Sequence, residues 1–222
     1  MMANKKTKDW RKAVRKAMRA AADKEARQRY GSRKPSFNYR WEHVTAVVAL
    51  ARKLAELTGA DLEVVEAAAW LHDILKERGT THPAEGAAFA REFLPGTDFP
   101  AEKIEAVAQA IAEHTGLWRD EPLTTLESKV LWDADKLTKI GLTAAFHWTG
   151  LALADGKPMR TVDLIRRGRT NAWQRKTVNS MHTEPARQAA KKRIRAFQKL
   201  WERLEIELSG NDMILVESQR SG

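Results

Sequence analysis

The stretch AAAWLHDILK, residues 67–76, places a histidine and an aspartate within the most apolar segment of the chain. Its apolar residues surround the expected helix almost completely, so we predict that a helix from about 61 to 77 lies at the centre of the core. A carboxylate is costly to bury there unless a cation or strong hydrogen-bond donors lie beside it. Either Asp73 meets an arginine or a helix end and His72 is an ordinary core histidine, or both residues belong to a functional site.

Apolar residues recur every three or four positions on both sides of this stretch. The spacing predicts helices over about 8–30, 41–58, 83–94, 101–114, 125–140 and 142–153, and a long final helix after Thr183. Residues 156–182 are polar and basic and show no clear repeat. Because no hairpin signal separates two alternating runs, we expect an all-α fold, a compact helical bundle with a basic N-terminal helix and a long C-terminal helix. We divide the chain into a basic helix and linker at 1–35, a helical domain at 36–210 and a flexible tail at 211–222.

Positive charge is concentrated at two places in the chain. The formal net charge of the 222 residues is +10, made up of +11 over 1–40, −9 over 41–155, +11 over 156–203 and −3 over 204–222. Such basic flanks can bind nucleic acid or another anionic partner, or they can dock on their own domain. The flanks therefore keep nucleic-acid binding open as a function.

Several classes of protein are excluded by what the chain lacks. There is no cysteine, which excludes disulfides, cysteine-ligated zinc, iron–sulfur clusters and thiol nucleophiles. No apolar run approaches the ~18–20 residues of a membrane span, and no apolar segment of a secretory signal follows the basic N-terminus. We therefore expect a cytoplasmic protein with no membrane partner. The oligomeric state is left open.

Histidines and carboxylates recur on successive predicted helices and are expected to face a shared interior. Imidazole and carboxylate ligands without thiolate suit Mn, Fe, Co, Ni, Zn or Mg, and all-helical metal sites draw one or two ligands from each helix. One divalent ion would be held by His43, His72, Asp73 and Asp135. A second ion would be held by His82 and His114, with Asp73 as the bridging carboxylate.

The order of these motifs resembles the HD-domain superfamily of metal-dependent phosphohydrolases. The matching pieces are WEHVTAVVALARKLAEL, AAAWLHDILK, THPAEGAAFAREFL, AIAEHTG and LESKVLWDADKL, and they cover roughly residues 40–140. The resemblance implies that His43, His72, Asp73 and Asp135 are metal ligands, with Asp73 also taking part in catalysis. The histidines at 82 and 114 are similar to those that some two-metal members use for the second ion.

The chain departs from parts of the family three residues after the His-Asp pair. Members that hydrolyse guanosine tetraphosphate or deoxynucleoside monophosphates usually carry an acid there, whereas this chain has Lys76 followed by Glu77. The pattern resembles the His-Asp-x-x-Lys variant of cyclic-dinucleotide and dinucleoside-polyphosphate hydrolases, although the Gly-Tyr-Pro segment of the cyclic-dinucleotide enzymes is absent. Lys76 is therefore a candidate catalytic residue that contacts phosphate, and the alternative is a solvated lysine at a helix end.

Four further cations are weaker candidates for contacts with substrate phosphate: Lys136, Arg166, Arg167 and Arg169. Asp133 is interpreted as structural and His182 as a loop residue. His147 is either a core histidine or part of the lining of a substrate pocket. The eight tryptophans mostly fit apolar stripes, so we interpret them as packing residues.

These observations support two hypotheses from different classes. The first is a phosphohydrolase that cleaves a phosphate ester or anhydride of a nucleotide with metal-activated water. The second is a nucleic-acid-binding protein, or a phosphodiesterase acting on nucleic acid, that uses the basic flanks.

Overall fold

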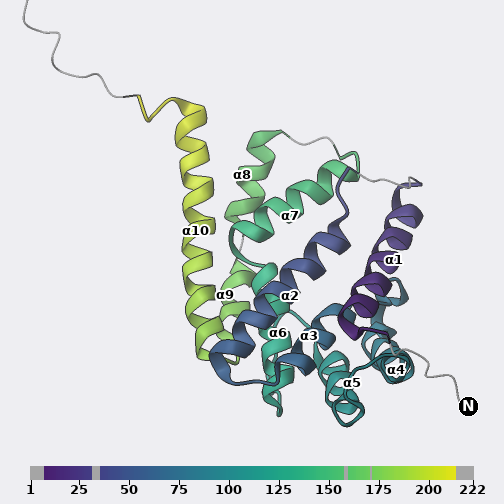
Figure 1. Ribbon diagram of the computed structural model, residues 1–222. Helices are drawn as coiled ribbons and strands as arrows, with labels where there is room; N and C mark the ends of the chain where they lie inside the picture. Colours follow the sequence, from purple (N-terminus) through teal and green to yellow (C-terminus); the bar gives the residue numbers. More distant parts are fainter. Residues whose placement is uncertain (1–7, 32–35, 158–159, 171, 214–222) are drawn as a thin grey trace, which may run out of the picture.

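A computed structural model describes residues 8–31, 36–157, 160–170 and 172–213, and over these residues it is helical (Figure 1). The α-helices run α1 Trp10–Tyr30, α2 Tyr39–Thr58, α3 Leu62–Leu71, α4 His82–Phe93, α5 Ile104–Glu113, α6 Leu126–Thr138, α7 Gly141–Ala154, α8 Thr161–Arg169, α9 Ala172–Asn179 and α10 Glu184–Ser209. Three short 3-10 segments are η1 Lys76–Thr81, η2 Leu94–Gly96 and η3 Ala101–Lys103. The expected all-α fold is confirmed.

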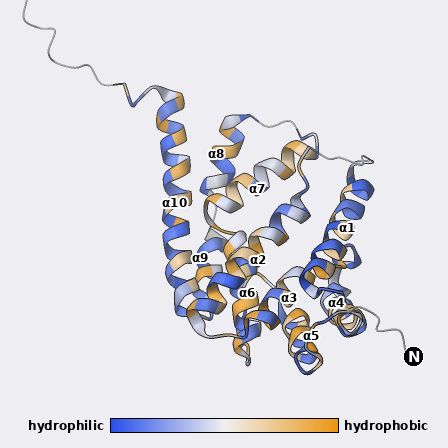
Figure 2. Cartoon of the chain, viewed as in Figure 1, coloured by the Kyte–Doolittle hydropathy of each residue, from blue (hydrophilic) through white to orange (hydrophobic). Residues whose placement is uncertain are grey.

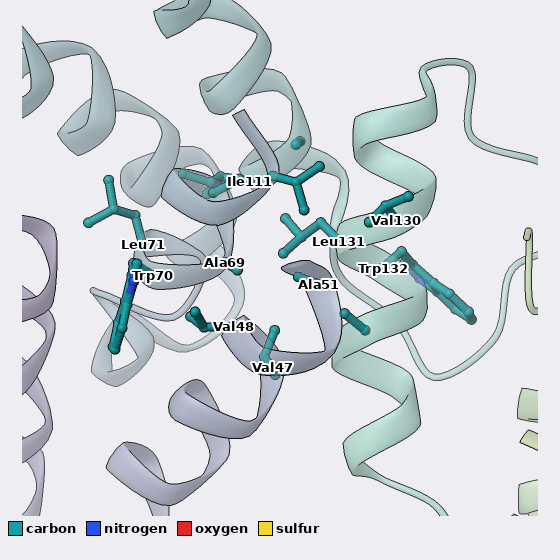
Figure 3. Close-up of a cluster of buried hydrophobic side chains, with 14 of the residues drawn as sticks. Val47, Val48, Ala51, Ala69, Trp70, Leu71, Ile111, Val130, Leu131 and Trp132 are labelled. Atoms are coloured by element: carbon teal, nitrogen blue, oxygen red, sulfur yellow. The ribbon is translucent and has the colours of Figure 1, made fainter. Parts of the chain in front are cut away.

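The stretch 67–76, which forms the second half of α3 and the turn after it, lies at the centre of the molecule, as its composition predicts. Helices α2, α5 and α6 enclose α3, and their fully buried side chains meet in one core (Figure 3). Examples are Ala51 on α2, Leu71 on α3, Ile111 on α5, and Leu131 on α6. Single residues cap the ends of these helices. Gly59 ends α2 with a φ of 76°, and the side chain of Asp61 accepts two backbone N–H groups at the start of α3.

The central helix is shorter than the sequence predicts, and the reason bears on the site. We expected it to continue to about 77, but α3 ends at Leu71. His72 N–H still bonds to the carbonyl of Ala68, whereas the next bonds join residues three apart, from Ile74 N to the oxygen of Leu71 and from Lys76 N to the oxygen of Asp73. The backbone therefore tightens and turns directly after His72, so the His-Asp pair stands at the end of α3.

The basic helix α1 belongs to the same core. Trp10, Val14, Met18 and Ala22 are buried, and the ring of Trp10 meets the ring of Phe99 edge-on at 5.1 Å between centroids. Figure 2 shows apolar bands along α1 and α10 beside long hydrophilic stretches, which matches the amphipathic patterns in the sequence. Docking on its own domain is thus what the structure shows for α1. The predicted boundary at 35 and most of the predicted tail at 211–222 lie outside the described residues.

Residues 156–182, for which the sequence shows no clear repeat, contain α8 and α9. The three arginines at 166, 167 and 169 therefore lie on a helix, α8. These helices pack against α10, and the indole of Trp201 lies where a side chain at Gly168 would stand, with a Cβ there only 2.2 Å from the ring. Thr183 occupies the N-cap position of α10 as expected, but its hydroxyl donates to Asp133 rather than accepting from the helix. None of the described helices is long and apolar enough to cross a membrane.

Candidate metal centre

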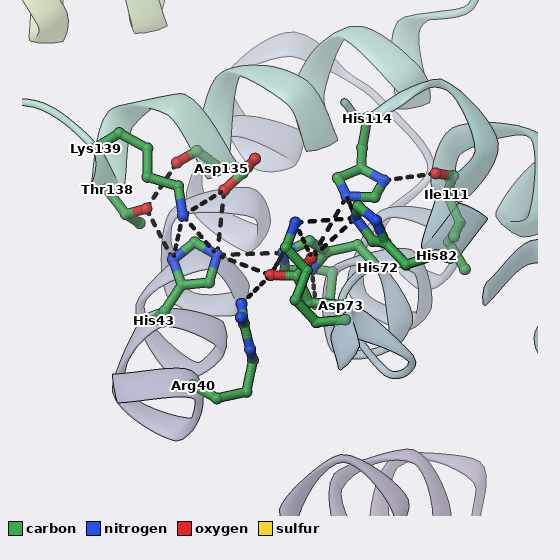
Figure 4. A network of polar contacts seen from close by, with 12 residues as sticks. Arg40, His43, His72, Asp73, His82, Ile111, His114, Asp135, Thr138 and Lys139 are labelled. Carbon is green, nitrogen blue, oxygen red and sulfur yellow. Dashed lines mark hydrogen bonds and ion pairs between the residues drawn. The ribbon is translucent and has the colours of Figure 1, made fainter. Parts of the chain in front are cut away.

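The predicted ligands converge from five parts of the chain (Figure 4). His43 lies on α2, the His-Asp pair follows α3, and His82 is the first residue of α4. His114 directly follows α5, and Asp135 lies on α6. Each of the six residues is at most 4% exposed. The sequence prediction that these side chains share one interior site therefore agrees with where the structure places them, and their role as ligands stays a prediction.

The six side chains form two adjacent groups, each with three possible ligand atoms within 4.8 Å of one another. The groups are His43, His72 and Asp135, and Asp73, His82 and His114. The Asp73 carboxylate lies between them: its Oδ2 is 3.5 Å from Nε2 of His43, and its Oδ1 is 3.4 Å from Nε2 of His82. This is the bridging position that the sequence predicts for Asp73.

Backbone oxygens hold three of the imidazoles in one orientation. Nδ1 of His72 lies 2.8 Å from the carbonyl oxygen of Ala69, Nδ1 of His114 lies 2.6 Å from that of Ile111, and His82 contacts Gly79 in the same way. A carbonyl oxygen can only accept, so each Nδ1 carries a proton, and in the neutral form of the ring the lone pair of Nε2 faces the cluster. Metal-binding histidines are commonly oriented by such a bond.

The fourth imidazole is oriented by a side chain. The hydroxyl of Thr138 donates to the carbonyl oxygen of Asp135 at 2.7 Å, so its oxygen is free to accept from Nδ1 of His43 at 3.0 Å. All four rings therefore turn Nε2 inwards. The Nε2 atoms of His72 and His43 are 3.4 Å apart, and those of His82 and His114 are 3.3 Å apart.

This arrangement fits a bound cation. Lone pairs that face each other at such distances repel, whereas two nitrogens about 2.1 Å from one ion would lie about 3.0–3.4 Å apart. In addition, Oδ1 of Asp73 and Oδ1 of Asp135 are buried and have no hydrogen bond; the nearest ammonium groups are those of Lys76, 3.3 Å from Oδ1 of Asp73, and Lys139, 3.6 Å from Oδ1 of Asp135. A buried carboxylate oxygen without a donor is costly unless a positive charge compensates it. The donor set suits one or two divalent ions.

The charges around Asp73 explain why it is ionised although it is buried. Burial alone would raise its pKa, but the guanidinium of Arg40, in direct contact with its Oδ2, holds the pKa well below the usual range. Burial also lowers the pKa of His72 to about 3, so its ring is neutral near pH 7, as a ligand must be. Arg40 bridges to Glu25 on α1 at 2.7 Å.

Comparison with known proteins agrees with the geometry. The family model of the HD domain matches residues 40–140, the segment that carries all six residues. Residues 40–140 of this chain are an HD domain. YpgQ of Bacillus subtilis (strain 168) is 30% identical over 122 residues, which are 52% of this chain and 59% of that protein. The match thus spans less than two thirds of YpgQ.

Solved structures of similar proteins share the fold over nearly the whole chain. A predicted HD superfamily hydrolase from an uncultured Thermotogales bacterium has a TM-score of 0.63 at 23% identity, covering 89% of this chain and 92% of that one. B. subtilis YpgQ has a TM-score of 0.64 at 22% identity, with coverage of 91% and 97%. A structure of YpgQ in complex with ADP has a TM-score of 0.59 at 25% identity, with coverage of 86% and 100%.

Three lysines lie at the edge of the cluster of this HD domain, in different settings. Nζ of Lys76 is 3.3 Å from Oδ1 of Asp73 and 3.0 Å from Nε2 of His82, and its side chain is 38% exposed. Lys136 is buried, and its ammonium contacts Asp135 and the carbonyl of His114, so its charge is already compensated inside the protein. Lys139, which the sequence analysis did not single out, lies 3.2 Å from Nε2 of His43.

A cavity of about 360 Å³ opens beside the cluster, where α6 ends. Thr138 and Lys139 of the HD domain line it, and the rest of the lining comes almost entirely from α7 to α10. Its walls carry several aromatic rings, those of Tyr39, His147, Trp148, Trp173 and Phe197. His147 thus belongs to the pocket lining, one of the two alternatives that the sequence left open. The cavity joins the ligand cluster to the C-terminal third of the chain.

The three arginines predicted to contact phosphate have different partners. Arg166 lies 3.4 Å from Asp163, and Arg169 pairs with Glu205 on α10, so both charges are compensated on the surface. Arg167 alone of the three lines the cavity, and its guanidinium lies 3.8 Å from the ring centroid of Trp148. In the part of the chain that the structure describes, no carboxylate pairs with Arg167.

Sequence reasoning missed Arg40, Thr138, Lys139 and the aromatic walls of the cavity. The sequence contained a signal for the first three. Arg40 is three residues before His43, and Thr138 and Lys139 follow Asp135 by three and four, so each lies on the same helix face as a predicted ligand. For Trp148 and Trp173 no local signal existed, because they come to line one cavity only through the packing of separate helices.

Proposed function

We propose that this protein is a metal-dependent phosphohydrolase that cleaves a phosphate ester or anhydride of a nucleotide. The observation that carries the proposal is the convergence of four imidazole Nε2 atoms and two ionised carboxylates beside a cavity large enough for a small organic group. Similarity to HD-superfamily hydrolases supports the same class of reaction.

In this proposal the six buried side chains hold one or two divalent ions, drawn from Mn, Fe, Co, Ni, Zn or Mg, with Asp73 between the two positions. Bound there, such ions lower the pKa of a coordinated water molecule and neutralise charge on a phosphoryl group. The chain itself fixes the direction of every imidazole through the Nδ1 hydrogen bonds, so the ligand atoms need no rearrangement before binding.

Two cations flank the centre from opposite groups of ligands. Lys76 stands beside His82, and Lys139, which lines the cavity, stands beside His43. We assign both ammonium groups to contacts with substrate phosphate, because each touches a ligand-bearing group while part of its side chain faces solvent. Lys136 is less suited to this role, since it is buried against Asp135.

A nucleotide is the favoured substrate class for two reasons. The cavity offers aromatic walls for a flat ring next to the polar cluster, and B. subtilis YpgQ, which shares the fold, has been solved with ADP. The alternative of nucleic-acid binding is weakened by the internal pairing of α1, where Arg11 bonds to Glu66, Lys24 to Glu77 and Arg29 to Asp155. Part of the positive charge of the N-terminal flank is thus used within the fold.

The test combines metal analysis with a panel of nucleotides and phosphodiesters assayed with each of Mn, Co, Ni and Mg. The wild type should retain or take up a divalent ion and hydrolyse at least one nucleotide. Asp73→Asn, which keeps the size of the side chain but removes the bridging charge, should lose metal and activity together. Asp120→Asn is the matched control, because Asp120 is exposed on a loop. Full activity in the Asp73 variant would contradict the proposal.

A further inference from the structure

Helix α9 contributes to the lining of the cavity a buried side-chain amide whose oxygen lacks a hydrogen-bond partner. Gln174 on α9 is 1% exposed and lines the cavity, and its side-chain Oε1 is buried without any hydrogen bond. Leaving a buried polar atom unsatisfied costs about 1–3 kcal/mol, so such an atom at a cavity wall calls for a donor from outside the chain.

The surroundings of Gln174 restrict what that donor belongs to. Trp173 precedes it on α9, while Trp148 and Phe197 reach the same cavity from α7 and α10. Trp148 is covered on one side by the guanidinium of Arg167, which has no carboxylate partner among the described residues. Indole rings and a stacked guanidinium are surfaces that bind flat heteroaromatic rings, and they do so with little preference among them.

The cavity also has polar residues in its lining, next to the ligand cluster. Thr138 and Lys139 border it there, and both also contact His43 of the ligand cluster. A molecule that occupies the cavity with its phosphate end at Lys139 would therefore place its other end against α7, α8 and α9. Aromatic walls thus supply affinity, and Gln174 is the polar side chain among them whose oxygen lacks a partner.

We propose that this cavity is the base subsite of the enzyme and that Gln174 selects nucleobases that present an exocyclic amino group, as adenine and cytosine do. The inference rests on the proposed function for the identity of the substrate, but it concerns residues outside the HD domain. The amino group donates to Oε1 of Gln174 while the ring stacks on the aromatic walls. A base with a keto group at the same position presents an acceptor, which meets Oε1 unfavourably unless the side-chain amide turns its Nε2 towards it.

The binding test uses nucleosides, which contain no phosphate bond that could be cleaved. Quenching of tryptophan fluorescence is titrated with adenosine against inosine, and with cytidine against uridine, on the metal-loaded full-length chain. The wild type should bind the amino-bearing member of each pair about tenfold more tightly, the effect of one satisfied buried hydrogen bond. In Gln174→Leu the two members should bind equally. Gln28→Leu, on the exposed face of α1, is the matched control and should keep the wild-type preference.

A second variant keeps the test decisive if Gln174→Leu does not fold. Gln174→Glu retains an acceptor of the same shape, so it should bind adenosine and cytidine in preference to the keto partners at least as strongly as the wild type. Equal binding of both members by the wild type, or an unchanged preference in Gln174→Leu, would overturn the proposal. So would loss of the preference in Gln174→Glu.

Hydrolysis is measured separately, so that the two proposals can fail independently. With ATP and ITP the ratio of kcat/KM should follow the binding ratio and fall to about one in Gln174→Leu. Base preference that depends on Gln174, without hydrolysis of any nucleotide, would keep the subsite and contradict the phosphohydrolase. Hydrolysis with a base preference independent of Gln174 would keep the phosphohydrolase and overturn the subsite.

Discussion

The ligand cluster and the neighbouring cavity differ in how their polar groups are satisfied. In the cluster, each of the four imidazoles bonds through Nδ1 to an oxygen of the chain, and Asp73 touches Arg40. In the cavity, Oε1 of Gln174 has no hydrogen bond, and among the described residues Arg167 has no carboxylate. The imidazoles of the cluster are therefore oriented by the protein itself, with only Oδ1 of Asp73 and Oδ1 of Asp135 lacking a hydrogen bond, whereas the polar groups of the cavity wall are left to be completed by a ligand. Changes should accordingly affect stability and metal binding on one side, and substrate selection on the other.

The largest loss of stability is expected where a buried charge of the cluster loses the ion-pair partner that compensates it. Arg40→Met should destabilise the metal-free protein by about 3 kcal/mol or more, because it leaves buried Asp73 without its closest cation. Urea unfolding after treatment with a chelator measures this. The control Arg91→Met breaks an exposed pair with Glu105 and should cost less than about 1 kcal/mol. Equal losses in both variants would show that Asp73 does not depend on Arg40.

A smaller effect is expected from removing the hydroxyl that orients His43. Thr138→Val keeps the volume but takes away the acceptor of the Nδ1 proton, so metal affinity should fall by about 10–100-fold. Competition with a chromogenic chelator measures the change. Thr45→Val removes a hydroxyl that bonds only to backbone carbonyls of α2, so it is the control and should bind metal normally. An unchanged affinity in Thr138→Val would mean that His43 is oriented in another way.

In the cavity wall, the protonation of His147 makes the stability of the fold depend modestly on pH. Burial lowers the pKa of this half-buried histidine from 6.5 to about 4. As the pH falls, the unfolded chain takes up the proton first, so stability is lost between about pH 6.5 and pH 4. After a discount for solvent exposure the loss should be about 1 kcal/mol. Thermal unfolding of His147→Asn across this range should lack that component, and an identical pH profile in both proteins would refute it.

The smallest effect on stability is expected from substitutions of two arginines on α8, Arg167 and Arg169. Arg167→Met should change the free energy of unfolding by less than about 0.5 kcal/mol but raise KM about fivefold, because it removes the uncompensated cation of the cavity wall. Arg169→Met, which breaks only the surface pair with Glu205, should alter neither quantity by a comparable amount. A larger rise in KM for Arg169→Met would shift the substrate contact to the surface of α8.

The same contrast explains what could be predicted from the sequence. The positions of His43, His72 and Asp135 follow from the helical repeat, because each lies on the apolar face of a helix with a strong pattern. The early end of α3 after Leu71 could not be predicted, since the apolar pattern continues through Ile74 and Leu75 while the backbone changes to bonds between residues three apart.

The cavity depends on contacts between residues far apart in the sequence. Helix α8 is short and rich in arginine, and its buried residues Ile165 and Gly168 lie beside Trp201, more than thirty positions later. Residues 156–182 therefore show no pattern of their own in the sequence, although α8 and α9 form within this range. Asp133 was interpreted as structural, and it does accept N–H groups of His182 and Thr183 at the start of α10.

The close approach of Trp201 to Gly168 has a consequence for variation among relatives. A methyl group at 168 would overlap the indole, so a large ring at 201 requires glycine at 168, and a smaller residue at 201 would release that requirement. We therefore expect the two positions to covary. Because Arg167 and Thr170 lie on either side of Gly168 and line the cavity, a change of side-chain size on α10 would move them and alter its depth. The selectivity of the proposed base subsite can thus diverge among relatives while the proposed metal ligands stay the same.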